Sequence, residues 1–487
     1  MGGGGRGRGG GGGGDGQVPG GGPAADLRGL RATVMGLGLN GGGLGAARFL
    51  HARGARVTVT DLKTADELRP AVEALPAGVR VSLGSHRMDD FTGCDLVVKN
   101  PGVRPDSPFL AAACAAGAAV ETEQSLFLAR CRAPVLAVTG SKGKSTTAAA
   151  LAAILGEDAP ATRLSGNIGG SPLDFLDELT ADTPVVLELS SWQLGDLRGR
   201  GVLAPPVAVV TNLLRDHQNR YGSMEEYLQD KLVISEGQPP DGALVLNADD
   251  PWHRRFAERA AGRVVLFSAR QRPAGDGAWL QDGAGRISVA GRSGVAFDTE
   301  RVAPAGRVIG VNLLAAAAAA ASFGIEPATI RRGLRGFHGL PHRLEPVGEV
   351  AGVSFVNDSA ATIPEATVAA LASVTGPVVL LAGGADKALD FTDLAASADS
   401  ALRCVLLAGS ATAKLHSALR RAGVACDGPF DSLEDAFGAA LAAAAPGAAS
   451  GATVLLSPAC ASFGMFRNEF DRGDRFRAQV RRHAASR

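Results

Sequence analysis

Residues 134–147 read Pro-Val-Leu-Ala-Val-Thr-Gly-Ser-Lys-Gly-Lys-Ser-Thr-Thr, and this stretch decides the fold of the chain. Its apolar run Val135-Leu-Ala-Val138 predicts a buried strand, and an alanine-rich helix is predicted from Thr146 onward. At such a strand–loop–helix junction, free backbone N–H groups and the helix dipole attract an anion. The stretch therefore predicts a phosphate-binding loop in an α/β protein.

The predicted loop differs from a strict Walker A motif. Val138 stands five residues before Gly143, where that motif requires glycine, so an ordinary turn between strand and helix is an open alternative. In the phosphate-loop interpretation, Lys144 supplies a mobile charge for the β- and γ-phosphates. The Ser145 hydroxyl is of the type that holds Mg²⁺ beside them.

Composition limits the class of protein. A chain of 487 residues suggests two to four domains, and 46% hydrophobic residues suffice for several cores. The formal net charge is zero, which argues against a nucleic-acid-binding surface. Six scattered cysteines without a Cys-x-x-Cys pair argue against a zinc site and a disulfide framework, and predict a cytoplasmic protein.

The sequence predicts neither a membrane-spanning helix nor a signal peptide. We expect no transmembrane helix, because the longest apolar tract, residues 308–325, is mostly alanine and contains Asn312. No apolar stretch of signal-peptide type begins the chain. The glycine-rich residues 1–25 are predicted to be disordered, with a mis-assigned start codon as the alternative.

A second glycine loop lies near the start of the chain. Gly36, Gly38 and Gly41 form a G-x-G-x-x-G pattern between a predicted strand and a predicted helix, and the next strand ends at Asp61. This arrangement predicts a nucleotide-type ligand, with a purely structural turn as the alternative. A third strand, residues 95–100, leads into an Asn-Pro-Gly turn at the ligand-binding end of the sheet.

Of three polar residues that follow the phosphate loop, the first lies in a setting that predicts a metal or cation ligand. Glu188 lies near the end of an apolar strand, where a carboxylate is costly without a cation; an ordinary ion pair with lysine is the alternative. His217 follows the next apolar strand. An ordinary histidine in a surface loop is an open interpretation of this residue. Lys231 lies in a predicted helix over residues 224–236, where a lysine is normally a solvated side chain.

The last third of the chain predicts a further parallel, doubly wound sheet. Its strands are expected at residues 353–358, 377–382, 403–408 and 452–457. Polar loops at residues 358–362, 383–387 and 457–463 follow three of them. Such loops carry the ligand in an α/β sheet.

These motifs occur together in an order that resembles the Mur ligase family, and within it the glutamate-adding members, from about Leu27 to Phe476. The motifs that carry the resemblance are Gly140-Ser-Lys-Gly-Lys-Ser-Thr-Thr, Gly166-Asn-Ile-Gly, Leu187-Glu-Leu-Ser-Ser-Trp-Gln-Leu, Asp216-His with Arg220-Tyr, Asn247-Ala-Asp-Asp, Gly339-Leu-Pro-His-Arg, Gly383-Gly-Ala-Asp-Lys-Ala-Leu-Asp-Phe and Leu455-Leu-Ser-Pro-Ala-Cys-Ala-Ser-Phe.

The resemblance implies an α/β fold of three domains: an N-terminal Rossmann-like sheet, a central P-loop-type ATPase sheet and a C-terminal Rossmann-like sheet. Their expected bounds are 26–123 for UDP-substrate binding, 124–338 for ATP binding and 339–487 for glutamate binding, after the tail 1–25. It also implies an ATP-dependent amide ligase of cytoplasmic peptidoglycan synthesis. Glutamate would be added to UDP-N-acetylmuramoyl-L-alanine through an acyl phosphate, by a monomer with no nucleic-acid or membrane partner.

Roles for individual residues follow from the same resemblance. The implied cofactors are ATP, two Mg²⁺ ions and a carbamate on Lys231. The implied catalytic residues are Lys144, Asn167, His217 and Lys231, and the implied metal ligands are Ser145, Glu188, His217 and Lys231. The implied ATP-binding residues are Gly140, Ser141, Lys142, Gly143, Lys144, Ser145, Thr146, Asn312 and Arg343. The UDP substrate would contact Leu39, Asn40, Asp61, Asn100, Gly102, Ser190 and Gln193, and glutamate would contact Thr362, Lys387, Ser462 and Phe463.

The sequence departs from the family pattern at several places. Ala360 stands where the family has a lysine near the amino acid, and Asn312 is the only candidate left in the adenine-contact segment. Lys142 stands where asparagine is common, as in a branch that adds L-glutamate. D-glutamate is the favoured substrate, with the L-glutamate variant, folylpolyglutamate synthase, another Mur ligase or a non-catalytic nucleotide-binding relative as alternatives.

Overall fold

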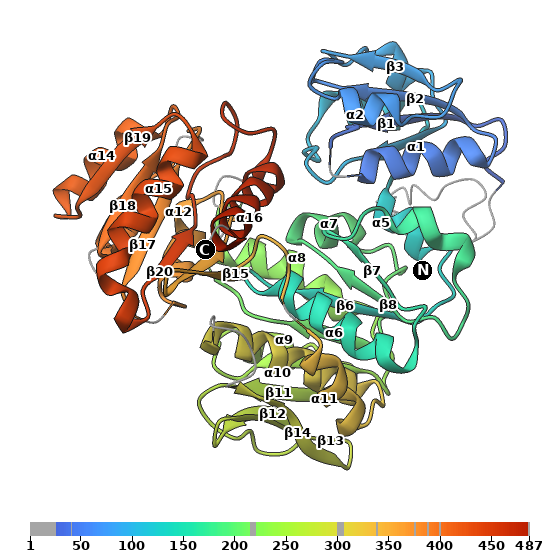
Figure 1. Ribbon diagram of the computed structural model, residues 1–487. Coiled ribbons are helices and arrows are strands. Elements are labelled where there is room, and N and C mark those ends of the chain that lie inside the picture. Colours follow the sequence, from blue (N-terminus) through green and yellow to red (C-terminus); the bar gives the residue numbers. More distant parts are fainter. Residues whose placement is uncertain are drawn as a thin grey trace, which may run out of the picture. The chain divides into compact units, whose positions relative to one another are not determined.

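The computed structural model describes residues 26–39, 41–214, 221–299, 306–337, 339–374, 376–386, 389–398 and 401–485. It shows a mixed α/β protein with three sheet-bearing regions, which confirms the predicted fold class (Figure 1). The predicted tail 1–25 lies outside the described residues. The chain divides into two compact units. The first unit comprises Met1–Val135, Leu164–Pro205 and Asn219–Gly237. The second unit comprises Leu136–Arg163, Pro206–Gln218 and Gln238–Arg487.

The first unit contains a five-stranded sheet in the order β3-β2-β1-β4-β5, with every neighbouring pair parallel. Its strands are β1 (Arg31–Met35), β2 (Arg56–Asp61), β3 (Arg80–Leu83), β4 (Leu96–Lys99) and β5 (Ala119–Thr122). Its helices are α1 (Gly42–Ala52), α2 (Arg69–Glu73), α3 (Asp89–Thr92), α4 (Pro108–Ala115) and α5 (Glu123–Leu128). This order places the carboxyl ends of β1, β2 and β4 side by side, as in a Rossmann-like sheet.

The same unit also holds five further elements; Asn167 directly follows the first of them, Glu188 ends the third and Lys231 lies in the last. The five elements are β7 (Arg163–Gly166), the 3₁₀ helix η1 (Pro172–Glu178), β8 (Val185–Glu188), α7 (Ser191–Leu197) and α8 (Met224–Glu236). The helix predicted over residues 224–236 is confirmed. Its first turn is capped by the Ser223 hydroxyl, which accepts a hydrogen bond from the Glu226 N–H at 3.2 Å.

The second unit contains a run of seven strands in the order β14-β13-β12-β11-β10-β9-β6. The strands are β6 (Val135–Thr139), β9 (Val207–Val210), β10 (Ala243–Asn247), β11 (Arg263–Ser268), β12 (Gly277–Gln281), β13 (Ala284–Val289) and β14 (Arg292–Asp298). The accompanying helices are α6 (Lys144–Asp158), α9 (His253–Ala257), α10 (Gly306–Ser322) and α11 (Pro327–Arg335). Pairing is parallel from β6 to β12 and antiparallel from β12 to β14.

Close packing of small residues fixes α6 against its neighbours. The alanines of α10 from Ala315 to Ala321 are fully buried. A side-chain carbon at Gly333 of α11 would lie 2.6 Å from the Ile154 Cα of α6, so only glycine allows this approach. The helix begins at Lys144, two residues earlier than predicted, because Gly143 turns the chain at φ 81°.

The second unit also contains a six-stranded sheet in the order β15-β16-β20-β17-β18-β19. Its strands are β15 (Glu345–Val350), β16 (Val353–Asn357), β17 (Val378–Gly383), β18 (Arg403–Leu407), β19 (Cys426–Phe430) and β20 (Thr453–Leu456). Its helices are α12 (Pro364–Leu371), α13 (Thr392–Ser397), α14 (Thr412–Arg421), α15 (Leu433–Ala444), η4 (Ala445–Ser450) and α16 (Glu469–Ala485). A buried core lies on each side of this sheet.

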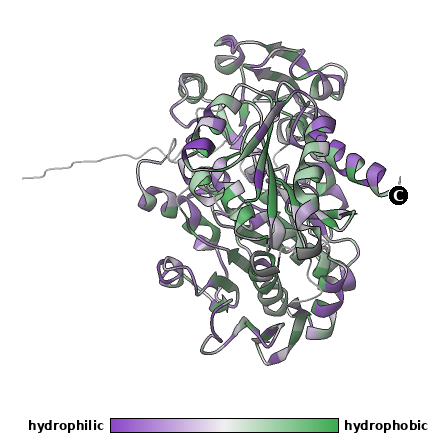
Figure 2. Ribbon diagram, turned by 60° about the vertical axis from the view of Figure 1, so that its left-hand side comes forward, coloured by the Kyte–Doolittle hydropathy of each residue, from purple (hydrophilic) through white to green (hydrophobic). Residues whose placement is uncertain are grey.

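The prediction of a fully parallel sheet in this region is wrong at one edge. The strand β15 pairs antiparallel with β16, while the other four pairs are parallel. A short turn at Ala351 and Gly352 joins the two strands as a hairpin, with both residues at positive φ. In Figure 2 the hydrophobic colouring follows the strands, whereas the C-terminal helix is largely hydrophilic.

Candidate active site

Two glycines give the phosphate loop its shape. A side-chain carbon at Gly140 would lie 1.9 Å from the Thr211 Oγ1, and one at Gly143 would lie 2.1 Å from the Asn312 Oδ1. Both residues have positive φ, 145° and 81°. The loop therefore requires glycine at both positions for space and for backbone conformation.

The loop is also held by the carboxyl end of β9, the parallel neighbour of β6. The Asn212 Oδ1 accepts a hydrogen bond from the Lys142 N–H at 2.9 Å, and the Asn212 Nδ2 donates to the Lys142 carbonyl at 3.1 Å. The Thr211 hydroxyl donates to the same carbonyl at 2.6 Å. Sequence reasoning missed this pair, although polar residues directly after a buried strand were a usable signal.

Lys144 and Ser145 lie at the start of α6, where an anion is favoured. The Lys144 Nζ donates to the Ser141 carbonyl at 2.9 Å, so its side chain folds over the loop. Ser145 is buried and Thr146 is half-buried. Asn312 lies against Gly143, and its carbonyl accepts from the Thr147 hydroxyl at 3.4 Å; the adenine contact predicted for it stays a prediction.

Glu188, in the first unit, is a buried carboxylate with spare binding capacity. Its exposed fraction is 0%, and its Oε1 accepts from the Asn167 Nδ2 at 3.3 Å. Its Oε2 has no hydrogen-bond partner among the described residues. A buried oxygen without a partner is costly, so this carboxylate fits a cation ligand.

Lys231 lies on α8 and its exposed fraction is 1%, which rules out the alternative of a solvated surface lysine. Its Nζ lies 4.9 Å from the centre of the Tyr227 ring. The predicted ligand His217 lies outside the described residues. Within the parts of the chain that the structure describes, no group of three or more histidine, cysteine, aspartate or glutamate residues could hold a metal ion.

The N-terminal glycine loop meets the Asn-Pro-Gly turn. A side-chain carbon at Gly36 would lie 2.8 Å from the Asn100 Cβ, and the Asn100 Oδ1 accepts from the Gly102 N–H at 3.0 Å. Asp61 accepts from the Gly38 N–H at 3.1 Å, so it also braces the loop. Leu39, the residue after Gly38, is exposed, and Asn40 lies outside the described residues.

A buried ion pair joins the strand before this turn to α7. The Lys99 Nζ lies 2.6 Å from the Asp196 Oδ2, and both side chains are buried. At the start of α7, Ser190 and Gln193 form a capping box with hydrogen bonds of 2.8 and 3.3 Å. The Lys99–Asp196 ion pair therefore links the strand before the Asn100 turn to the helix that begins beside Ser190 and Gln193. Both ends of this link carry predicted contacts of the UDP substrate. No sequence signal linked the members of the ion pair, which stand 97 residues apart.

Glu123 is a second buried carboxyl group, beside the start of α1. A side-chain carbon at Gly42 would lie 2.9 Å from its Oε2, and its Oε1 has no hydrogen-bond partner among the described residues. Burial raises the pKa of Glu123 to about 7, with a smaller upward effect from Asp174 and opposing hydrogen bonds from Ser171 and Gln124. No sequence pattern singles out this residue.

Replacing Glu123 by glutamine is expected to stabilise the protein at alkaline pH. The folded protein keeps this proton up to about pH 7, whereas the unfolded chain releases it near pH 4.5, so its stabilising effect is complete below pH 4.5 and lost above 7. The difference in free energy of unfolding, Glu123→Gln minus wild type, should rise by up to about 3 kcal/mol between pH 5 and 8. Urea unfolding at several pH values measures this difference in free energy. For the control Glu73→Gln, at an exposed position, the difference from wild type should not change with pH. A difference that does not change with pH for Glu123→Gln would contradict the expectation.

The polar loops after β16, β17 and β20 meet at the same edge of the C-terminal sheet. The Ala459 N–H donates to the Ala361 carbonyl at 3.0 Å, and Ala385 and Ala461 exchange two backbone hydrogen bonds. Burial raises the pKa of Asp358 to about 7, against the hydrogen bonds from Ser457 and Leu344 and the nearby Arg343 charge.

Three of the four predicted glutamate contacts lie on these loops. Thr362 is half-buried, Phe463 is 61% exposed, and Ser462 is 3% exposed with no hydrogen-bond partner for its Oγ in the described structure. Lys387 lies outside the described residues. Arg343 is exposed and close enough to Asp358 to lower that carboxyl's pKa.

A glycine loop between a buried strand and a helix, with a lysine and a hydroxyl at the helix start, is the arrangement typical of a phosphate-binding loop in an α/β protein. The chain belongs to the Mur ligase family. Residues 31–122 match the family model of the MurD-like N-terminal domain, residues 138–320 match the Mur ligase middle domain, and residues 342–460 match the Mur ligase glutamate ligase domain. Membership in this family implies ATP and Mg²⁺.

Similar proteins extend over nearly the whole chain. A UDP-N-acetylmuramoylalanine–D-glutamate ligase of Roseiflexus sp. (strain RS-1) is 47% identical, over 93% of this chain and 99% of that protein. A ligase of the same name from Treponema pallidum (strain Nichols) is 38% identical, over 93% and 98%. The crystal structure of MurC from Thermotoga maritima shares the fold with a TM-score of 0.59 and 19% identity, over 94% of this chain and 100% of that one.

Proposed function

We propose that this protein is an ATP-dependent ligase that joins D-glutamate to UDP-N-acetylmuramoyl-L-alanine in peptidoglycan precursor synthesis. The observation that carries this proposal is the similarity, over nearly the full length of both chains, to ligases named for this reaction. Those names favour D-glutamate over the L-glutamate alternative. The buried Glu188 favours an enzyme over a non-catalytic relative, since its Oε2 has no hydrogen-bond partner among the described residues and a bound cation would offset the cost of its burial.

The proposed reaction has two steps. The alanyl carboxylate attacks the γ-phosphorus of ATP, which releases ADP and forms an acyl phosphate. The amine of glutamate then attacks the acyl carbon; the amine loses a proton and phosphate leaves as the amide forms. Such a reaction requires positioning and charge neutralisation more than covalent help from the protein.

In this proposal the phosphate loop binds the triphosphate through its backbone N–H groups, and Lys144 follows the charge of the γ-phosphate. Ser145 and Glu188 are proposed as Mg²⁺ ligands, together with His217 and a carbamate on Lys231 at a second ion. The ions would neutralise the negative charge of the phosphates. Asn167, through its 3.3 Å hydrogen bond to Glu188, is in a position to orient that carboxylate.

The proposed domain roles keep the expected bounds: residues 26–123 bind the UDP substrate, 124–338 bind ATP and 339–487 bind glutamate. The Lys99–Asp196 pair supports the first role, because it holds the Asn100 turn against α7.

We also propose a monomer. None of the described helices has the length and apolar character that a membrane span requires. The six cysteines are free thiols, which supports the proposed cytoplasmic location.

Release of ADP by the purified protein tests the proposal. With ATP, Mg²⁺ and UDP-N-acetylmuramoyl-L-alanine, we expect turnover with D-glutamate and little with L-glutamate. Turnover with L-glutamate alone would establish the alternative stereochemistry. Absence of turnover with both enantiomers would leave a nucleotide-binding protein without ligase activity.

A further inference from the structure

Arg472 is a fully buried arginine that joins two of the C-terminal loops. Its exposed fraction is 0%, and it lies in the first turn of α16. Its Nε donates to the Ser359 Oγ at 3.0 Å, one terminal nitrogen donates to the Ser359 carbonyl at 2.9 Å, and the other donates to the Cys460 carbonyl at 3.2 Å. One side chain therefore sets the spacing of the loop after β16 and the loop after β20.

The charge of Arg472 is not neutralised by a bonded carboxylate within the described residues. All three of its hydrogen bonds go to neutral oxygens. Burial lowers the pKa of Arg472 to about 10, with Cys460 and Glu469 opposing, so the side chain stays protonated at neutral pH. A buried cation without a bonded anion is costly, and an anionic ligand near the loops would offset this cost.

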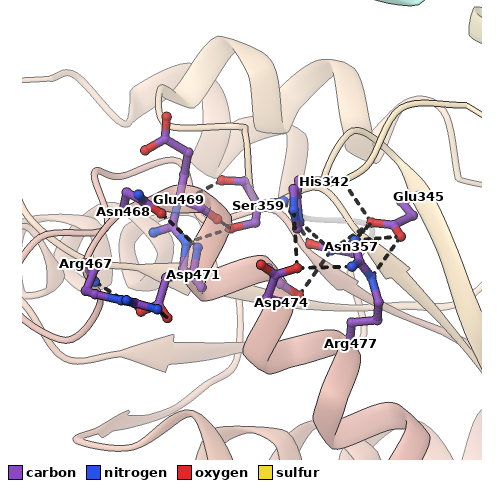
Figure 3. A network of polar contacts seen from close by, with 12 residues as sticks. His342, Glu345, Asn357, Ser359, Arg467, Asn468, Glu469, Asp471, Asp474 and Arg477 are labelled. Atoms are coloured by element: carbon purple, nitrogen blue, oxygen red, sulfur yellow. Dashed lines mark hydrogen bonds and ion pairs between the residues drawn. The ribbon is translucent and has the colours of Figure 1, made fainter. Parts of the chain in front are cut away.

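The position of Arg472 is fixed by the docking of α16 on the β15–β16 hairpin. A side-chain carbon at Gly473 would lie 2.1 Å from the His342 Nδ1, so the helix approaches as closely as glycine permits. Arg477 makes two hydrogen bonds of 3.0 Å to Glu345, which also accepts from the Asn357 Nδ2 at 3.0 Å. Figure 3 shows this network between the helix and the hairpin.

The loop that Arg472 holds at Cys460 carries a buried hydroxyl with unused capacity. Ser462 follows two residues later; its exposed fraction is 3%, and its Oγ has no hydrogen-bond partner in the described parts of the chain. The Phe466 N–H donates to the Ser462 carbonyl at 3.2 Å, which fixes the backbone there. A hydroxyl held in this way is a ready donor for a carboxylate oxygen.

We propose that Arg472 is a positioning residue of the amino-acid subsite, where it holds the Ser359 and Cys460 loops and supplies positive charge behind them for a substrate carboxylate. This inference rests on the proposed function, since the amino acid is the glutamate of that reaction. Arg472 would thus contribute part of the positive charge of the subsite without touching the substrate.

Steady-state kinetics of Arg472→Gln tests the proposal, with Ser359→Ala as a milder second variant. For Arg472→Gln we expect the KM for glutamate to rise about 10- to 100-fold, because the substitution removes the positive charge and the charged-group hydrogen bonds that hold the two loops of the subsite. The KM values for ATP and the UDP substrate should change less than about 2-fold. Ser359→Ala removes one acceptor and should raise the KM for glutamate about 3- to 10-fold. Arg472→Lys keeps the charge without the fork of donors and should lie between wild type and Arg472→Gln.

The control is Arg475→Gln, which removes an exposed arginine one turn further along α16 that pairs with Asp471. Its kinetics should equal those of wild type. If Arg472→Gln does not fold, Ser359→Ala and Arg472→Lys decide the question. An unchanged KM for glutamate in the folded variants, or an equal rise of all three KM values, would overturn the proposal. Absence of turnover in the wild type would instead overturn the proposed function.

Discussion

Replacing Lys144 by methionine is expected to lower kcat/KM for ATP about 10²- to 10³-fold, the usual cost of removing one group that stabilises transition-state charge. Methionine keeps the length of the side chain and removes its charge. The fold should survive, because Gly140, Gly143, Thr211 and Asn212 shape the loop without the lysine side chain. Coupled measurement of ADP release, with thermal unfolding alongside, separates activity from stability.

The matched control for Lys144→Met is Lys414→Met, on the exposed side of α14. That substitution removes the same charge from a side chain that the proposed chemistry does not use, so its kcat/KM for ATP should stay within about 2-fold of wild type. Wild-type kinetics in Lys144→Met would mean that the loop after β6 is a structural turn and that the nucleotide binds elsewhere.

Replacing Lys231 by arginine is expected to lower kcat about 10²-fold or more, because the loss of a metal ligand costs several kcal/mol of charge stabilisation. The neutral lysine amine adds to CO₂ and loses a proton, which gives an anionic carbamate. Arginine cannot form this group and leaves a cation at the buried position. If the variant retained wild-type kcat, the carbamate proposal would be wrong.

Removal of CO₂ gives an independent test of Lys231. Activity of the wild type in CO₂-free buffer should fall and return when bicarbonate is added, because carbamate formation is reversible. The residual activity of Lys231→Met should be insensitive to bicarbonate. Thermal unfolding of both Lys231 variants should accompany the assay, since Lys231 is 1% exposed and its replacement also changes packing.

In the N-terminal and C-terminal sheets the central strands were predictable, and the edge strands were not. The predicted strands of the N-terminal and C-terminal sheets that the structure confirms have strong apolar runs; β16, β17, β18 and β20 are almost wholly buried. The missed strands in these two sheets are the edges β3, β5, β15 and β19. Two of them contain proline or glycine, in keeping with the residues that protect sheet edges from further pairing.

The candidate site divides in a similar way. Gly140, Lys144, Glu188 and the Asn100 turn were found because short-range sequence patterns mark them. Asn212, Asp196, Glu123 and Arg472 were missed, since each acts through a partner distant along the chain. Such partners are set by topology and packing, and of these four residues only Asn212, directly after a buried strand, has a local sequence signal.

The contact between Gly143 and Asn312 also has a consequence for protein synthesis. Asn312 accepts from Thr147 across 165 residues, so the segment that completes the loop leaves the ribosome long after the loop itself. At elongation rates of about 5–20 residues per second, this delay is on the order of ten to thirty seconds. The loop after β6 therefore reaches its final packing only after α10 has emerged from the ribosome.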